Sequence, residues 1–190
     1  MQEMTDRRFL EDYFDRYKRA LFDTNVSDLL VQAAERVRQV KRENKKLLVV
    51  GNGGSASIAG HAALDFSKQG GVRSMSFASD ALVTALSNDY GYERWVEAAL
   101  ELYADPGDVV VLISTSGRSS NILRAAQKAL EMGLDIITFS GFAEDNPLKM
   151  AGGLSFWLES RAYNIVENTH QIWLLAICDL VIGQAEYSVS

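Results

Sequence analysis

The sequence predicts an α/β fold built around a mainly parallel sheet. Short apolar segments alternate with helical patterns along most of the 190 residues. Two of these segments run into loops rich in glycine and hydroxyl residues, and each loop leads into a helix. A hydrophobic content of 47% supports one domain with a sizeable core, and no linker rich in Pro, Gly or Ser divides the chain. We therefore expect a three-layer domain over residues 1–190, with helices on both faces of the sheet.

The chain begins with two predicted helices, over residues 5–22 and 27–44. Apolar residues recur there at helical spacing and would form one stripe on each helix. In the first helix the stripe consists of Leu10, Tyr13, Phe14, Tyr17 and Leu21. We therefore divide the domain into a helical N-terminal extension, residues 1–45, and an α/β core, residues 46–190.

Strands and helices alternate in the predicted core. We expect strands at 46–51, 73–78, 108–114, 135–140 and 154–158. We expect helices at 55–68, 80–87, 92–103, 119–132 and 165–184, with a short helical turn at 146–151. Such alternation favours parallel strands that are joined by right-handed crossovers.

The predicted last helix is apolar around nearly its whole circumference between Ile165 and Ile182. Such a helix must be buried on most sides. A chain of this size has difficulty enclosing a helix that is apolar all round. We therefore expect another subunit to cover part of the last helix, together with the aromatic stripe of the first helix. Cys178 in this helix is the single cysteine, which excludes an internal disulfide, and we expect it to be a small buried apolar residue.

The most informative loop follows the strand at 108–114. Ser114, Thr115, Ser116 and Ser119 lie beside a glycine there, and helical spacing starts at about Ser119. The unpaired N–H groups at the start of that helix and the hydroxyls can bind a phosphate together. Helix capping explains a serine-rich turn equally well, so this segment alone leaves both interpretations open.

A second loop of the same kind follows the strand at 46–51. It contains Asn52, Gly53, Gly54 and Ser55, and Ser55 is the expected N-cap of the next helix. Glycines let the backbone turn tightly and approach a ligand. Both loops would lie at the carboxyl ends of strands, where ligands bind in open α/β sheets, so we expect them to face one phosphorylated molecule. The spacing of a nucleoside triphosphate loop is absent.

Two pairs of a histidine and a carboxylate lie beyond the loops. His61 and Asp65 are four residues apart on one predicted helix, and Glu167 and His170 are three apart on another, so each pair shares a helix face. Such groups could form a metal site or an acid and base pair. Each histidine could equally be a hydrogen-bonded core residue.

Charge and hydropathy exclude several classes of function. The net charge of −6 argues against a nucleic-acid-binding surface, which needs a basic face. The apolar runs are interrupted too early for a membrane span, and the polar start lacks the order of a signal peptide. We therefore expect a cytoplasmic protein with no nucleic acid and no membrane among its partners.

In their order and spacing, these motifs resemble the sugar isomerase (SIS) domain of the bacterial phosphoheptose isomerases. The likeness is carried by the loop from Gly51 to Ser55, the helix with His61, the turn signal Asn88-Asp89-Tyr90-Gly91, and the loop from Ile113 to Ser119. The resemblance covers almost the entire chain. It implies a five-stranded parallel sheet flanked by helices, a homotetramer with active sites between subunits, and often zinc at the site.

The resemblance also implies a reaction and a binding site. Family members convert sedoheptulose 7-phosphate to D-glycero-D-manno-heptose 7-phosphate for lipopolysaccharide or capsule. The residues that match the family's substrate-binding positions are Asn52, Gly53, Gly54, Ser55, Asn88, Asp89, Ser114, Thr115, Ser116 and Ser119.

The catalytic positions match the family unevenly. His61 matches a metal ligand, Asp65 stands where the family has a glutamate that is ligand and base, and Glu167 stands in place of a glutamine ligand. We expect these three residues to be catalytic and to hold a divalent metal ion, which the resemblance implies to be zinc. Leu175 stands where the family has a histidine that is metal ligand and general acid, and leucine can perform neither role. Our hypothesis is that Asp65 or Glu167 is the base, with His61 and His170 completing a metal or acid role.

The sequence alone leaves two classes of function open. The first is an aldose–ketose isomerase of a phosphorylated sugar with an altered catalytic set. The second is a noncatalytic sugar-phosphate-binding protein, a sensor or a protein-interaction factor like the relatives that associate with the replication initiator. The loss of the last-helix histidine favours the second class. The presence of His61 and of a carboxylate at Asp65 favours the first, because a scaffold would need neither.

Overall fold

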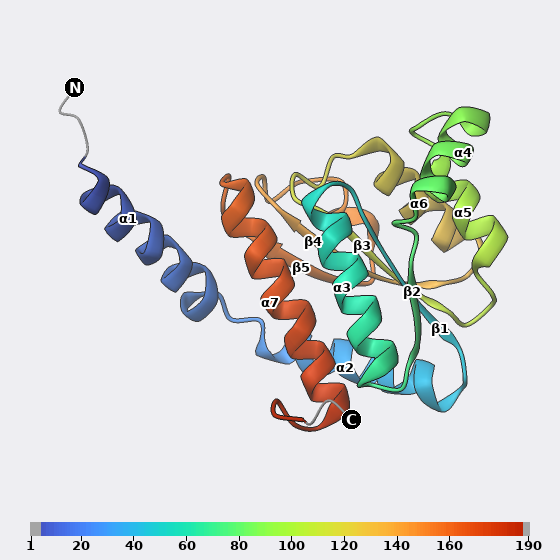
Figure 1. Cartoon of the computed structure of the whole chain (residues 1–190), viewed down its shortest axis with the longest axis horizontal. Helices are drawn as coiled ribbons and strands as arrows, with labels where there is room; N and C mark the ends of the chain where they lie inside the picture. The colour runs from blue at the N-terminus through green and yellow to red at the C-terminus, as the bar shows by residue number, and fades with distance from the viewer. Residues whose placement is uncertain (1–4, 188–190) are drawn as a thin grey trace.

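A computed structural model describes residues 5–187 and shows a five-stranded parallel sheet between two layers of helices (Figure 1). The strands are β1 (Lys46–Gly51), β2 (Arg73–Ser76), β3 (Val109–Ser114), β4 (Asp135–Gly141) and β5 (Leu154–Leu158). Their order in the sheet is β2-β1-β3-β4-β5. The predicted fold class is confirmed, because the apolar segments that mark strands are buried on both faces.

Helices cover the two faces in separate groups. The core helices are α3 (Gly54–Lys68), α4 (Asp80–Tyr90), α5 (Trp95–Tyr103), α6 (Ser120–Glu131) and α7 (Tyr163–Ile182), with a 3-10 turn at Lys149–Ala151. Helices α3 and α7 share one apolar core with α2 (Ser27–Arg42), whereas α4, α5 and α6 share the other. The strands lie between these two cores (Figure 1).

The N-terminal extension consists of α1 (Asp6–Lys18), a π-helical turn at Arg19–Asp23, and α2. Helix α1 extends away from the rest of the molecule (Figure 1), and none of its residues is buried. The helix predicted at 5–22 therefore exists, but it changes to π-helical geometry at Arg19. Of its apolar stripe, Leu10 and Phe14 are exposed to solvent in one chain, whereas the other three residues are half-buried.

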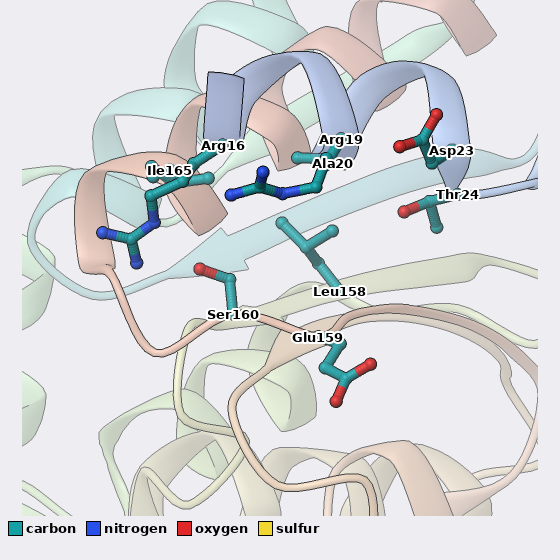
Figure 2. Close-up of a pocket in the computed structure, with 9 residues that line it drawn as sticks. All are labelled: Arg16, Arg19, Ala20, Asp23, Thr24, Leu158, Glu159, Ser160 and Ile165. Atoms are coloured by element: carbon teal, nitrogen blue, oxygen red, sulfur yellow. The ribbon is translucent and has the colours of Figure 1, made fainter. Parts of the chain in front are cut away.

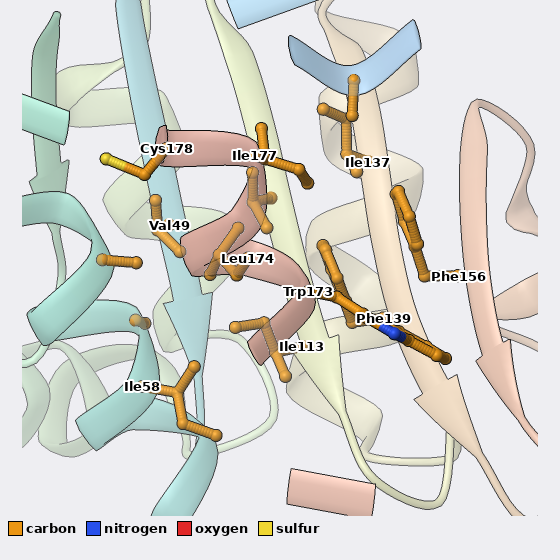
Figure 3. Close-up of a cluster of buried hydrophobic side chains, with 14 of the residues drawn as sticks. Val49, Ile58, Ile113, Ile137, Phe139, Phe156, Trp173, Leu174, Ile177 and Cys178 are labelled. Carbon is orange, nitrogen blue, oxygen red and sulfur yellow. The ribbon is translucent and has the colours of Figure 1, made fainter. Parts of the chain in front are cut away.

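Helix α7 packs its apolar residues against the sheet and against α2 and α3. Trp173, Leu174 and Ile177 lie over Ile113 and Phe139 of the strands (Figure 3). Within the described part of the chain, α7 is the one helix long and apolar enough to cross a membrane, with a mean hydropathy of 1.3 over its best window. The expectation that every apolar run is interrupted too early for a span is therefore wrong for α7 by length and composition. Its buried side chains pack against the sheet, α2 and α3, as those of a core helix do.

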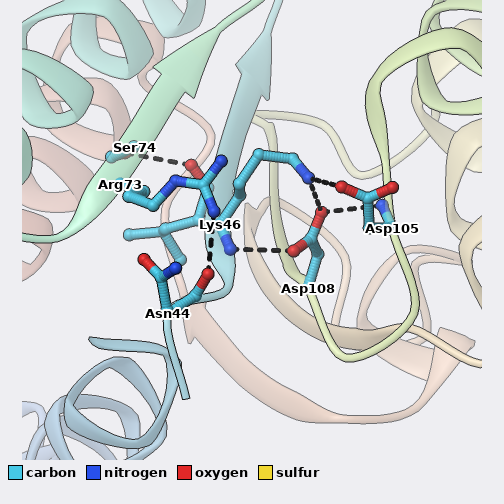
Figure 4. Close-up of polar contacts among 7 residues, drawn as sticks. Asn44, Lys46, Arg73, Ser74, Asp105 and Asp108 are labelled. Carbon is cyan, nitrogen blue, oxygen red and sulfur yellow. Dashed lines mark hydrogen bonds and ion pairs between the residues drawn. The ribbon is translucent and has the colours of Figure 1, made fainter. Parts of the chain in front are cut away.

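A buried ionic network closes the sheet at the amino ends of β1 and β3 (Figure 4). The Asp108 carboxylate is fully buried and accepts hydrogen bonds from the backbone N–H groups of Lys46 and Asp105, each at 2.8 Å. The Lys46 ammonium lies 2.8 Å from the same carboxylate and also pairs with Asp105. This network ties the start of β1 to the segment that leads into β3.

Several predicted helix ends differ from the structure. The helix predicted at 92–103 starts at Trp95, the one predicted at 165–184 covers Tyr163–Ile182, and two further boundaries are set by glycine. Ser55 is not the N-cap of α3, because the helix starts at Gly54 with Gly53 as its N-cap at φ 53°, and Ser55 is buried inside the first turn. Helix α4 does not end at residue 87, because it continues to Tyr90 and stops at Gly91, which has φ 87°. A positive φ that suits glycine sets both boundaries, in preference to the polar residues nearby.

Candidate functional site

The two predicted loops meet at one end of the sheet. In the register of the parallel pair, Gly51 of β1 lies beside Ile113 of β3, so the loops that follow these residues start side by side. The chain passes from β1 outward to β2 and from β3 outward to β4, so the strand order reverses between β1 and β3, where an open α/β sheet is expected to have its ligand crevice. In open α/β sheets, such a reversal of strand order is where small molecules bind.

The first loop lies directly against the last helix. Gly54 faces the carboxylate of Glu167 from α7, and a Cβ atom at this position would clash with that carboxylate. Glu167 Oε1 also accepts a hydrogen bond from the Thr115 hydroxyl at 3.3 Å, which connects the second loop to the same helix. The structure therefore brings Gly54, Thr115 and Glu167 together, as three members of the predicted site.

The second loop has a fixed, hydroxyl-lined turn. Ser114 and Ser119 lie with their hydroxyl oxygens 3.0 Å apart, and the Gly117 N–H donates to the Ser114 carbonyl at 2.8 Å. Gly117 has φ 65°, and a Cβ there would clash with the side chain of Asn146. The Ser116 hydroxyl accepts from the Arg118 N–H at 3.3 Å. Ser119 is the N-cap of α6 but makes no capping hydrogen bond through its side chain, so the first N–H groups of this helix can serve an anion.

A pair of amide side chains joins the two loops. Asn52 follows β1, and Asn121 lies in the first turn of α6. Asn52 Nδ2 donates to Asn121 Oδ1 at 2.9 Å, and Asn121 Nδ2 donates to Asn52 Oδ1 at 2.8 Å. The Tyr92 hydroxyl donates to the same Asn52 oxygen at 3.2 Å. Asn121 and Tyr92 were not among the predicted site residues.

The predicted pair of His61 and Asp65 lies on the side of α3 that faces α7. His61 Nε2 is 3.2 Å from Asp65 Oδ2, and the amide of Gln171 on α7 lies 3.1 Å from His61 Nδ1. The Gln171 amide donates to Nδ1, so the ring proton belongs on Nε2 and points to Asp65. Gln171 is a third site residue that the sequence analysis missed.

The predicted metal ligands are not gathered into one cluster. Across residues 5–187, no group of three His, Cys, Asp or Glu side chains is placed to hold a metal ion. His61 and Asp65 pair with each other, whereas Glu167 is bonded to Thr115. Leu175 on α7 supplies no donor atom. The residues present therefore do not fit a divalent ion in this arrangement, and no step below is derived through one.

Three other predicted residues lie outside this arrangement. Asn88 and Asp89 are in the last turn of α4 instead of the expected turn, and their side chains are bonded to each other. No hydrogen bond in the described segment joins them to either loop. His170 is fully buried, where its Nε2 donates to the Ser140 carbonyl at 3.0 Å, so the metal or acid role expected of it is wrong. Burial lowers the pKa of His170 to about 4, against the opposing effect of that hydrogen bond.

A second carboxylate, Asp179, lies near Asp65 on the α7 side. Burial and the charge of Asp65 raise the pKa of Asp179 above its usual value. Cys178 is buried as predicted, and burial, with the charges of Asp65 and Asp179, raises the pKa of its thiol to about 12. The thiol is therefore protonated at neutral pH and is no nucleophile.

A pocket of about 370 Å³ lies elsewhere, between the N-terminal extension and the end of β5 (Figure 2). Arg16, Arg19, Asp23 and Glu159 contribute two positive and two negative charges to it. Arg19 is already paired with Asp15. The charges balance and none of the predicted site residues lines this pocket, so we place the functional site at the two loops.

Comparison with known proteins gives consistent results. The SIS domain family profile matches residues 12–141. A phosphoheptose isomerase from Roseiflexus sp. (strain RS-1) is 34% identical over 170 residues, which cover 86% of this chain and 85% of that protein.

Solved structures extend the comparison to the fold. The phosphoheptose isomerase from Neisseria gonorrhoeae superposes with a TM-score of 0.86 at 27% identity, covering 93% of this chain and 99% of that one. A phosphoheptose isomerase from Francisella tularensis has a TM-score of 0.88 at 23% identity, covering 95% and 100% of the two chains. The second likeness bears on the fold alone.

Proposed function

Since the chain belongs to the SIS domain family, we propose that it is an aldose–ketose isomerase that acts on a phosphorylated sugar. The observation that carries this proposal is the meeting of two glycine and hydroxyl loops at the crevice between β1 and β3. Hydroxyl groups of the second loop and free N–H groups at the start of α6 are suitable donors for a phosphate. The phosphate would be bound there, with the sugar directed towards α7.

The substrate that we propose is sedoheptulose 7-phosphate, converted to D-glycero-D-manno-heptose 7-phosphate. Relatives that share a third of their residues with this chain are named phosphoheptose isomerases. The product would serve lipopolysaccharide or capsule synthesis in the cytoplasm, without nucleic acid or membrane as a partner.

The reaction needs one proton to move between neighbouring carbons through an enediol. We assign the base to Asp65, because it lies beside His61, whose imidazole can manage the proton of the sugar oxygens, whereas Glu167 has no imidazole bonded to it. Asp65 takes the proton from one carbon and returns it to the next. When the sugar is bound, His61 Nε2–H turns from Asp65 to the sugar oxygens: it gives its proton to the carbonyl oxygen and then takes the proton of the neighbouring hydroxyl, so that the imidazole ends the reaction unchanged. Glu167 orients the substrate at the loops.

The decisive experiment follows the conversion of sedoheptulose 7-phosphate by NMR. We expect the wild-type protein to form the aldose phosphate, and Asp65→Asn to lower kcat by about 10²–10⁴-fold, the usual value of a positioned acid or base. Glu131→Gln, an exposed change at the end of α6, is the matched control and should leave kcat unchanged. Full turnover by Asp65→Asn would contradict the assignment.

The same assay tests the divalent metal ion that the family resemblance implies. We expect dialysis against a chelator to leave turnover within about twofold, and added zinc not to increase it, because the donor atoms of His61, Asp65 and Glu167 are not assembled around one point. Loss of turnover after chelation, with recovery on adding zinc, would assign these residues to a metal site instead.

Leu175 favours a second candidate function, a noncatalytic sugar-phosphate sensor or protein-interaction factor. Its side chain stands in the α7 stripe between Gln171 and Cys178, and it can neither donate nor accept a proton. Tight binding of sedoheptulose 7-phosphate, measured by calorimetry, with no conversion over a long incubation would establish the sensor and exclude the enzyme.

We also propose a homotetramer with sites between subunits. Helix α1 has no buried residue, and on α7 the side chain of Ile172 is 46% exposed. Apolar surface of this kind on a helix that otherwise packs in a core is typical of a subunit interface.

A further inference from the structure

Asn121 is too deeply buried to contact a ligand. Its residue is 1% exposed, and both ends of its amide are used by the amide of Asn52. Such an asparagine does not touch a ligand in the crevice directly. It acts on the residue to which it is bonded, and that residue is half-exposed at the tip of the first loop.

The hydrogen bonds of Asn52 fix the orientation of its side-chain amide. Its Oδ1 accepts two hydrogen bonds, at 2.8 Å from Asn121 and at 3.2 Å from Tyr92, which use both lone pairs of a carbonyl oxygen. Its Nδ2 has two hydrogens and uses one for Asn121 Oδ1. The remaining N–H of Asn52 is therefore the group that it can offer, and it selects an acceptor oxygen in the ligand.

The same pair also sets the separation of the two loops. Asn52 belongs to the loop after β1 and Asn121 to the helix after the β3 loop, and 69 residues separate them in sequence. The two hydrogen bonds between these side-chain amides have normal lengths. They resist both sliding and separation of the two loops, because either movement would break both hydrogen bonds.

We propose that Asn121 is a positioning residue, which holds the two phosphate-binding loops in register and turns one N–H of Asn52 towards an acceptor oxygen of the bound sugar phosphate. Tyr92 supports it by satisfying the second lone pair of Asn52. This inference rests on the proposed function only for the identity of the ligand. The arrangement itself predicts weaker binding of any phosphate when the pair is broken.

The test uses Asn121→Asp, which keeps the shape of the side chain but removes its N–H donors. Because this change also adds a negative charge, the uncharged variant Asn121→Ala is measured beside it. We expect the KM for sedoheptulose 7-phosphate and the dissociation constant for inorganic phosphate each to rise about tenfold, the effect of one lost hydrogen bond of about 1.4 kcal/mol. The value of kcat should change less than about threefold, because Asp65 and His61 are untouched. Ser120→Ala, an exposed neighbour in the same helical turn, is the control and should change neither constant.

A second variant keeps the proposal testable if Asn121→Asp does not fold. Tyr92 is 55% exposed, so Tyr92→Phe removes only the hydroxyl and should fold normally. We expect it to weaken phosphate binding by about threefold, because the freed lone pair lets the Asn52 amide turn. Folded variants with unchanged phosphate affinity would overturn the proposal.

A double-mutant cycle distinguishes positioning through Asn52 from a general effect on the fold. In the Asn52→Ala background, Asn121→Ala should cause no further loss of phosphate affinity, because the group that it positions is gone. Losses that add independently would contradict the proposal. Phosphate titration needs no turnover, so these results stand even if the wild-type protein fails to isomerise sedoheptulose 7-phosphate.

Discussion

His170 shows how burial decides what a histidine can do. Its ring packs edge-on against Phe139 and near Trp173, and only Nε2 has a hydrogen-bond partner, the Ser140 carbonyl. The buried Nδ1 has no partner among the described residues. A protonated ring would need a partner for a second N–H in this apolar core, so the neutral form is strongly favoured.

The first prediction concerns the stability that this neutral form confers. The pKa of His170 is about 4 in the folded protein, whereas a histidine in the unfolded chain has a pKa near ~6.5. The unfolded state therefore binds a proton between these pH values that the folded state does not. The free energy of unfolding should fall as the pH drops through this window, by about 3 kcal/mol in total.

The variant His170→Gln keeps a donor for the Ser140 carbonyl but cannot titrate. Between pH 7 and pH 4.5, we expect it to lose less unfolding free energy than the wild-type protein, by about 2–3 kcal/mol. Urea unfolding at one fixed protein concentration measures this difference. Equal slopes for the wild-type protein and His170→Gln would show that His170 titrates normally.

At the scale of elements, the packing of α3 against α7 assembles the acid and base groups. Gln171 reaches His61 across this contact, although 110 residues separate them in sequence. The amide donates to Nδ1 and thereby leaves the proton on Nε2, where it points to Asp65. The packing of α3 against α7 therefore sets the tautomer of His61.

The next prediction tests this control of the tautomer. Gln171→Glu replaces the donor with an acceptor, so a proton should appear on Nδ1 of His61, and isomerase turnover should fall about tenfold or more. Nitrogen-15 NMR of labelled histidine at pH 8 measures the protonation directly, because the chain contains two histidines. Gln127→Glu on α6 is the matched control. An unprotonated Nδ1 in Gln171→Glu would contradict the assignment.

Sequence patterns predicted which helices and strands form better than they predicted the residues at which these begin and end. The strands were found because continuous apolar segments such as Val109 to Ile113 have no place except inside a sheet. The ends of α3 and α4 were misplaced because the polar residues Ser55 and Asn88 were taken as boundaries, whereas Gly53 and Gly91 set them by their backbone conformation.

The two loops of the site were predictable for a similar reason, since each is a continuous segment with its own composition. Asn121, Tyr92 and Gln171 were not, because each acquires its role from a partner 69, 40 or 110 residues away. Nothing in the local sequence of Tyr92 or Gln171 distinguishes these two from ordinary helix or turn residues. Asn121 alone carried a signal, its place in the first turn of a helix that starts at a phosphate-binding loop.

At the scale of the whole molecule, the contacts within a single chain do not account for the stability of helix α1. An isolated helix as short as the 13 residues of α1 is marginal in water. Its apolar side chains are nevertheless exposed, with Phe14 at 63% and Phe9 at 51%. Packing of α1 on another copy of the chain would bury this stripe and stabilise the helix.

The last prediction follows from this exposed stripe. The wild-type protein should have four times the mass of one chain by light scattering, and Phe14→Asp should dissociate the assembly, because a carboxylate cannot be buried unpaired in an apolar interface. Met150→Asp changes another exposed apolar side chain, 72% exposed on the 3-10 turn, and should leave the mass unchanged. Because sites between subunits need the intact assembly, Phe14→Asp should also lose turnover at protein concentrations where it is dissociated. A monomeric wild-type protein, or a Phe14→Asp variant of unchanged mass, would show that α1 does not hold the subunits together.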